Sequence, residues 1–306
     1  MQNEKNWSIG SLSEAFETHL RVVQGASSKT CDLYKQGAID FLEAKYGKKP
    51  IDLSTLHPLD LISFVTEYAS KYKPKTTQLL ASSLRRFLLF LQLNGLCDAR
   101  LVEAVPTVAN HKLAVLPATL SEEQVTRLLS SFDQSLASGL RGYAMVCCLT
   151  YLGLRADEVA HLSLEDIDWR AATLRIPKTK PRRPGLLPLP HPVGQAIADY
   201  LQRGRPATPE RRIFVRHRRP VGEPLTSFAV RSIIRRAFLR AGLNTASKGT
   251  HILRHTLATQ MIRKGASLKE IADVLRHRHL DTTFIYTKVD LPMLAEVAMP
   301  WPEVKK

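Results

Sequence analysis

Amphipathic helical spacing dominates the first third of this chain. From Leu12 to Gly95, apolar residues recur at intervals of three and four positions in four successive stretches. This is the spacing of the buried face of a helix. The clearest stretch runs from Lys75 to Leu93. Helices of this size and number pack as a small bundle, so we predict an all-helical N-terminal domain.

The helical pattern breaks after this bundle. Residues 99–117 contain prolines and a run of polar residues, and a capped helix start follows at Ser121. We therefore predict a helical domain over residues 1–107, a linker over residues 108–117 and a second domain over residues 118–306. A chain of 306 residues is long enough for each domain to bury a core of its own.

The second domain is predicted to be mostly helical with one small antiparallel sheet. Residues 143–152 are continuously apolar, as expected of a fully buried helix. Short runs typical of strands occur at residues 167–169, 173–176 and 185–189, with turn residues between them. The last two runs flank a basic, proline-rich loop at residues 177–184. The predicted fold class of the whole chain is thus mainly α.

Charge and composition narrow the range of functions. The formal net charge is +16 at pH 7, so the protein should attract a polyanion, unless it is merely a basic protein. The first ten residues lack the apolar core of a signal peptide, and no window holds the roughly 18 apolar residues that a membrane span needs. The four cysteines form no C-x-x-C pair, which fits a reducing compartment. These features predict a cytoplasmic protein that does not enter a membrane.

Cationic side chains and a tyrosine gather between His251 and Tyr286. His251 and Arg254 lie three residues apart, so on a helix they share a face. His277 follows at the end of a second predicted helix, and the whole set indicates phosphate chemistry. A zinc site built from His251, His255 and His277 is disfavoured, because Arg254 lies among them and the glutamate of a zinc-protease helix is missing.

A further arginine, Arg155, follows the buried helix directly and precedes Glu158. A charge at the rim of a core needs a partner. Two alternatives are open at this point: Glu158 alone satisfies Arg155, or the guanidinium points into a cleft and binds an anion.

Three segments resemble the conserved boxes of the tyrosine recombinases, the phage-integrase family. They are TYLGLRADEVAHL, HILRHTLATQMIRKG and LRHRHLDTTFIYT. The residues that match the family's catalytic set are Arg155, His251, Arg254, His277 and Tyr286, with Glu158 in a supporting position. The N-terminal bundle is similar to the family's SAM-like core-binding domain. The resemblance therefore covers nearly the whole chain, and it is greatest to compact Xer-type and mobile-element recombinases.

The resemblance implies a site-specific recombinase or integrase that cleaves and rejoins DNA strands through a 3′-phosphotyrosyl intermediate. Tyr286 would be the nucleophile, and Arg155 and Arg254 would bind the phosphate, because a guanidinium bonds two phosphate oxygens and stays charged. His251 and His277 would donate hydrogen bonds or transfer protons around the reacting oxygen. The phosphotyrosyl bond keeps the energy of the broken diester, so no cofactor, ATP or metal is expected.

The family protonates the leaving 5′ oxygen with a lysine on a β-hairpin loop. Here the loop offers Lys178 and Lys180, and its TKPRRPGLLPLP surroundings favour Lys180, with Lys178 as the alternative. The loop departs from the commoner G-K-G form of the family. Either lysine could instead make an ordinary contact with a phosphate of the DNA backbone.

Double-stranded DNA is the expected partner. The basic helix bearing Arg231 and Arg235 resembles the family's major-groove helix, where arginine could contact guanine edges or the backbone. In the N-terminal bundle, Lys75, Arg85 and Arg86 are candidates for DNA contacts, and a solvated face is the alternative for each of them.

The segment after Tyr286 contains a short amphipathic stretch. In the family such a tail docks into a neighbouring protomer, which implies a tetramer on paired sites, formed by this chain alone or with a related recombinase. The tail could instead pack on its own domain. Two rival functions are a topoisomerase of type IB, which would form no Holliday junction, and a DNA-binding protein with a degenerate site. The target sequence, and whether it lies in a phage, transposon, plasmid, integron or chromosome, are not encoded in these motifs.

Overall fold

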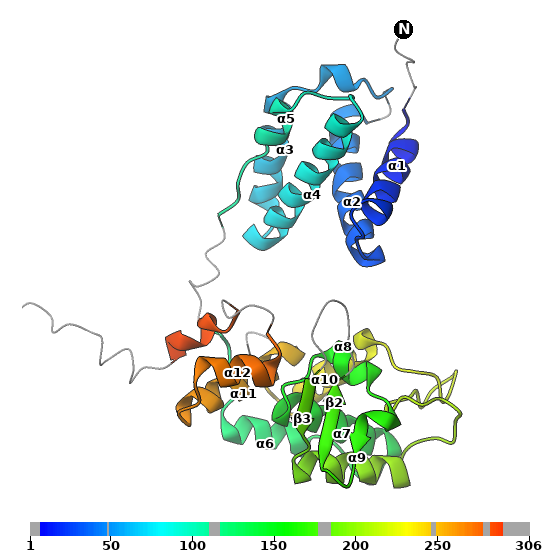
Figure 1. The fold of residues 1–306 in the computed structure, drawn as a ribbon, viewed down its shortest axis with the longest axis vertical. Helices are drawn as coiled ribbons and strands as arrows, with labels where there is room; N and C mark the ends of the chain where they lie inside the picture. The colour runs from blue at the N-terminus through cyan, green and yellow to red at the C-terminus, as the bar shows by residue number, and fades with distance from the viewer. Residues whose placement is uncertain are drawn as a thin grey trace, which may run out of the picture. The chain divides into compact units, whose positions relative to one another are not determined.

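The computed structural model describes residues 7–47, 49–109, 117–176, 185–245, 249–277 and 282–289. The chain divides into two compact units, Met1–Lys112 and Leu113–Lys306 (Figure 1). Each unit has a hydrophobic core of its own. Across the part of the chain that is described, no helix is both long enough and apolar enough to cross a membrane.

The first unit is a bundle in which all four predicted helices are present. Its helices are α1 (Ile9–Val22), α2 (Ser28–Tyr46), α3 (Pro58–Lys71), α4 (Pro74–Leu93) and the short α5 (Arg100–Glu103), with a 3₁₀ turn, η1, at Leu53–Thr55. Phe16, Phe41 and Phe87 are fully buried between them. Helices α2 and α4 meet closely at Gly37, where an added Cβ would lie 2.6 Å from the Ser83 hydroxyl. Glycine is therefore required at that crossing.

The second unit is mostly helical and is organised around the buried helix that the apolar run predicted. Its helices are α6 (Glu122–Ser130), α7 (Ala137–Tyr151), α8 (Ala156–His161), α9 (His191–Arg203), α10 (Ser227–Arg240), α11 (Thr250–Arg263) and α12 (Leu268–Leu275), with 3₁₀ turns η2 (Leu164–Asp166) and η4 (Phe284–Val289). Helix α7 packs against α9, α10 and α11. Its residues 144–149 are completely buried, which explains why they carry no polar face.

The one sheet has three short antiparallel strands in the order β1 (Ile167–Asp168), β2 (Thr173–Ile176) and β3 (Gly185–Pro188). Strands β2 and β3 pair from Thr173 opposite Pro188 to Ile176 opposite Gly185. Leu174 and Leu187 face each other in this register and are buried against the helices. The predicted fold class, mainly helical with a small antiparallel sheet, is confirmed.

Candidate active site

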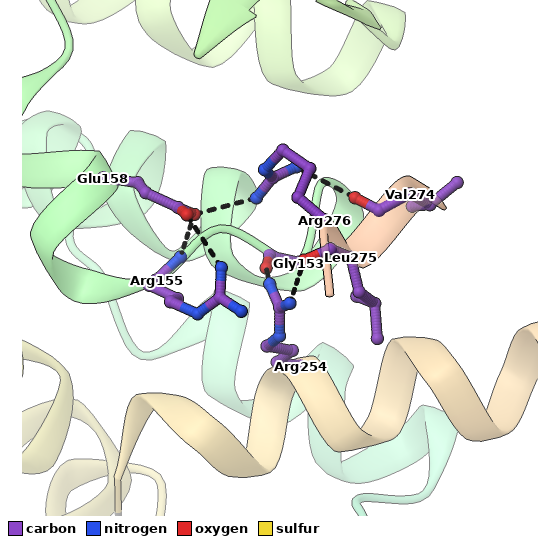
Figure 2. A network of polar contacts seen from close by, with 7 residues as sticks. All are labelled: Gly153, Arg155, Glu158, Arg254, Val274, Leu275 and Arg276. Atoms are coloured by element: carbon purple, nitrogen blue, oxygen red, sulfur yellow. Dashed lines mark hydrogen bonds and ion pairs between the residues drawn. The ribbon is translucent and has the colours of Figure 1, made fainter. Parts of the chain in front are cut away.

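Arg254 projects from α11 into the centre of the site. Its guanidinium donates to the carbonyl oxygens of Gly153, after α7, and of Leu275, at the end of α12 (Figure 2). Gly153 has a φ of 58°, and an added Cβ would lie 2.8 Å from Leu275 and 2.9 Å from Leu257. Only glycine fits so close an approach. Arg254, which is 3% exposed, therefore joins three segments that are far apart in the sequence.

Arg155 caps the N-terminus of α8 together with Glu158. The backbone N–H of Arg155 donates to Oε2 of Glu158 at 2.8 Å, and its guanidinium Nη1 donates to Oε1 at 2.9 Å. The Arg155 side chain is 16% exposed while Glu158 is 2% exposed. The ion pair that the sequence allowed is thus present, and the side chain of Arg155 stays partly exposed.

Positive charge exceeds negative charge in this network. Glu158 also accepts a hydrogen bond from Nη2 of Arg276 at 2.8 Å, so two guanidinium groups bond one carboxylate. Figure 2 shows a third guanidinium, that of Arg254, bonded to carbonyl oxygens instead. Burial alone would raise the pKa of Glu158, but the charges of Arg276 and Arg155 and the Arg155 N–H outweigh it and keep the carboxylate ionised.

Arg254 is the part of the network that would gain most from an anion. Its contacts are carbonyl dipoles rather than a carboxylate. Burial, followed by repulsion from Arg155, lowers the pKa of Arg254 to about 9, despite the opposing effect of Glu158. The group remains charged at neutral pH, and a phosphate placed beside it would relieve the repulsion among the arginines.

Tyr286 lies on η4 and is almost completely buried, at 1% exposure. It belongs to a small buried cluster with Ala258 and Ile262 of α11 and Ile271 and Leu275 of α12. Its hydroxyl lies 2.8 Å from Nδ1 of His255. Burial raises the pKa of Tyr286, and the nearby Arg254 and Arg155 oppose that rise.

The two histidines beside Tyr286 are held neutral. Burial first, and then repulsion from Arg254 and Arg155, lowers the pKa of His277 to about 3. Its Nδ1 lies 2.7 Å from the Thr283 hydroxyl, and its ring is parallel to that of Tyr286 at a centroid distance of 6.5 Å. Burial, followed by His251 and Arg254, also lowers the pKa of His255. Neutral imidazoles beside a buried phenol can accept or relay its proton.

Residues 118–291 match the model of the phage integrase family. The chain belongs to the phage integrase family. It is 42% identical to a putative integrase/recombinase of Sinorhizobium fredii over 289 residues, which cover 94% of this chain and 70% of the relative. It is 29% identical to the tyrosine recombinase XerA of Pyrococcus furiosus over 92% of this chain and 91% of the relative. It is therefore a tyrosine site-specific recombinase, which confirms the function expected from the three segments.

Solved structures show the same fold. The XerH site-specific recombinase, in a post-cleavage complex with palindromic difH substrate, matches with a TM-score of 0.74 and 21% identity, over 97% of this chain and 85% of XerH. A lambda integrase dimer bound to a COC′ core site matches with a TM-score of 0.71 and 18% identity, over 98% of this chain and 81% of the integrase. Both match across the two units of this recombinase.

The structure gathers most of the predicted site and adds two residues to it. Arg155, Glu158, Arg254, His277 and Tyr286 form one cluster. His251 lies one turn before His255 on α11, is exposed, and lowers the pKa of His255 through its charge. The two residues that sequence reasoning missed are His255 and Arg276.

A local signal existed for each missed residue. His255 directly follows Arg254, within the segment that indicates phosphate chemistry. Arg276 directly precedes His277. Lys178 and Lys180 lie outside the described residues, as does the tail after Asp290. Their roles remain predictions.

The candidate DNA contacts differ in their surroundings. Arg231 and Arg235 are exposed on α10, and Lys75 and Arg86 are exposed on α4. Arg85 is half-buried, and its Nη2 donates to the carbonyl oxygens of Val105 and Pro106, both at 2.9 Å. Arg85 thus has an intramolecular role, fastening the segment after α5 to the bundle, that the sequence did not indicate.

Proposed function

We propose that Tyr286 of this recombinase attacks a DNA phosphodiester bound by Arg155 and Arg254. The observation that carries the proposal is a buried tyrosine close to the charges of Arg254 and Arg155, where Arg254 is held by carbonyl oxygens and Arg155 by Glu158. Attack forms a bond between the phenolic oxygen and phosphorus and breaks the bond to the 5′ oxygen. The products are a 3′-phosphotyrosyl enzyme and a free 5′ hydroxyl end.

Excess positive charge is what this reaction requires. The pentacoordinate transition state gains negative charge on its non-bridging oxygens, and each fixed donor there contributes about 10²–10³ in rate. Arg254 is held rigidly by two carbonyl groups, and Arg155 is held by both oxygens of Glu158. The donors are thus oriented before the DNA arrives, and little reorganisation is needed at the moment of reaction.

The phenolic proton passes to Nδ1 of His255. This nitrogen lies 2.8 Å from the hydroxyl, and the depressed pKa of His255 leaves the imidazole neutral and able to accept. His277 and His251 then donate hydrogen bonds to the phosphate oxygens. A lysine of the hairpin loop, Lys180 or alternatively Lys178, gives its proton to the leaving 5′ oxygen. Reversal of these steps on a new 5′ hydroxyl rejoins the strand.

The substrate is proposed to be double-stranded DNA at paired sites in the cytoplasm. The net charge of +16 supports this, as do the exposed arginines of α10. Related proteins include a lambda integrase tetramer bound to a Holliday junction, 19% identical to this chain with a TM-score of 0.69. By analogy, four protomers act together, and the tail after Asp290 couples them.

Replacing Tyr286 with Phe tests the nucleophile. On a nicked duplex whose cleaved strand end diffuses away, Tyr286→Phe should abolish covalent protein–DNA adducts on a denaturing gel. It should change the dissociation constant for DNA by less than about threefold, because only one buried hydroxyl is removed. Tyr200→Phe, which also removes a buried hydroxyl of the same unit, is the matched control and should still form adducts. Persistent adducts in Tyr286→Phe would refute the assignment.

A further inference from the structure

Arg276 has an unusual backbone for its residue type. It ends α12 with a φ of 52° and a ψ of 51°, in the left-handed region where glycine is favoured and a side chain is strained. An arginine at such a position needs a compensating interaction. Its side chain is only 7% exposed, so the guanidinium does not extend into solvent.

The guanidinium of Arg276 is aimed at the carboxylate that holds Arg155. Nη2 donates to Oε2 of Glu158 at 2.8 Å, and Nη1 donates to the carbonyl oxygen of Val274 at 2.9 Å (Figure 2). The same Oε2 accepts the backbone N–H of Arg155. Arg276 and Arg155 therefore hold Glu158 together, with Arg155 on both oxygens and Arg276 on Oε2.

The stem of Arg276 also contacts the sheet. An added Cβ at Gly185 would lie 2.7 Å from Cδ and 3.3 Å from Cγ of Arg276. Gly185 begins β3, and its partner in the register is Ile176, the last residue of β2. The loop that bears Lys178 and Lys180 joins these two residues. The aliphatic part of Arg276 thus lies against the base of the lysine hairpin.

We propose that Arg276 is a positioning residue for DNA cleavage. It fixes the carboxylate of Glu158, and through Glu158 it orients the guanidinium of Arg155. Its aliphatic stem also positions the first residue of β3, at the base of the hairpin. The inference rests on the proposed role of Arg155 in binding the phosphate. Arg276 acts through Arg155 rather than on the phosphate itself, because its charge is already paired with Glu158.

Two substitutions separate this role from a structural one. Arg276→Gly deletes the guanidinium but suits the left-handed backbone. The relief of backbone strain therefore offsets part of the folding stability that is lost with the ion pair. Arg276→Lys keeps a positive charge but offers a point donor instead of a planar fork. If Arg276 only stabilised the fold, cleavage rates would follow the melting temperature, and Arg276→Gly would be nearly as active as the wild type.

The experiment measures single-turnover cleavage of the nicked duplex by the full chain. Arg276→Gly should cleave at least tenfold more slowly, with a DNA dissociation constant within about threefold of the wild type, and Arg276→Lys should recover part of the loss. A double-mutant cycle with Glu158→Gln should be strongly non-additive, since both changes remove the same support of Arg155. Wild-type rates for Arg276→Gly, or losses that multiply in the double variant, would overturn the proposal.

A substrate with a methylphosphonate at the cleaved position shows where the loss arises. Removing one charged non-bridging oxygen should lessen the effect of Arg276→Gly, and of Arg155→Ala in parallel, if both act on the phosphate charge. An Arg276→Gly loss that is equally large on both substrates would contradict action through Arg155. Arg155→Ala also separates the two proposals: if it cleaves the ordinary phosphate at the wild-type rate, the proposed function fails before Arg276 is tested.

Discussion

At the scale of single residues, the site shows how one carboxylate can organise a cationic centre. Glu158 has 2% exposure and is ionised because Arg276 and Arg155 overcome the effect of burial. The two alternatives for Arg155, an ion pair or an anion site, are compatible. The ion pair uses Nη1 of Arg155 and leaves its side chain 16% exposed.

His255 gives a prediction at this scale. His255→Gln should slow single-turnover cleavage by about 10²-fold, which is the lower end of the rate enhancement that a positioned proton acceptor provides. The imidazole accepts a proton only when neutral, and its pKa is lowered by burial and by His251 and Arg254. The wild-type rate should therefore stay high down to a pH below the ordinary histidine range and fall at lower pH.

Adduct formation measured from pH 5 to pH 9 tests the role of His255. In the variant, the fall on the acidic side should weaken, and the rate should rise towards high pH as the phenol ionises without help. His161→Gln is the matched control, since that side chain is 40% exposed and its Nδ1 lies 2.7 Å from the Asp157 carbonyl oxygen. Identical pH profiles for wild type and His255→Gln would rule out proton transfer to this nitrogen.

At the scale of elements, the helices were predictable and their meeting points were not. Periodic apolar residues specify α4 and the buried run specifies α7, because each pattern is local. The contact between Arg276 and Glu158 joins residues 118 positions apart. No spacing rule predicts which of two adjacent side chains, Arg276 or His277, will face that carboxylate. The left-handed turn that ends α12 decides it.

The hairpin between β2 and β3 gives a prediction at the scale of elements. On a substrate whose 5′ bridging oxygen is replaced by sulfur, the leaving group needs little protonation. Loss of the general acid should therefore be rescued there. We expect Lys180→Ala to cut cleavage of the ordinary substrate by about 10²-fold or more and to recover most of it on the sulfur substrate.

Lys178→Ala is the matched control, two residues away on the same loop. It should show a smaller loss that sulfur does not rescue, as expected for a contact with the DNA backbone. The opposite pattern would assign the acid to Lys178. Rescue of neither variant would remove both lysines as candidates.

At the scale of the whole molecule, the fold class and family followed from the sequence because they depend on repeated patterns and on motifs in order. The sequence alone could not define the site wherever a residue's role depends on its neighbours in space. Arg85 is an example: a basic residue on α4 that looked like a DNA contact is engaged with Val105 and Pro106. Its sequence context, beside the exposed Arg86, gave no sign of that difference.

Stability of the second unit should fall on acidification, because partly buried histidines are held there in neutral form. Burial lowers the pKa of His217 to about 4 with help from Arg141, and that of His277 to about 3. The unfolded chain binds these protons near pH 6.5, whereas the folded chain binds them only at lower pH. In that window the unfolded state holds more protons, so the free energy of unfolding rises with pH.

Calorimetric melting between pH 7.5 and pH 4 measures this slope. The melting temperature of the unit should fall steadily below about pH 6.5, and His217→Gln should flatten the fall, because the variant has one less group to protonate on unfolding. The variant starts from a lower melting temperature at pH 7.5, since it alters the contact with the Tyr200 hydroxyl at 3.2 Å. His57→Gln, at an exposed position in the first unit, controls for removing one imidazole. A slope unchanged by His217→Gln would mean that other groups govern acid unfolding, and the burial of neutral histidines would then not explain it.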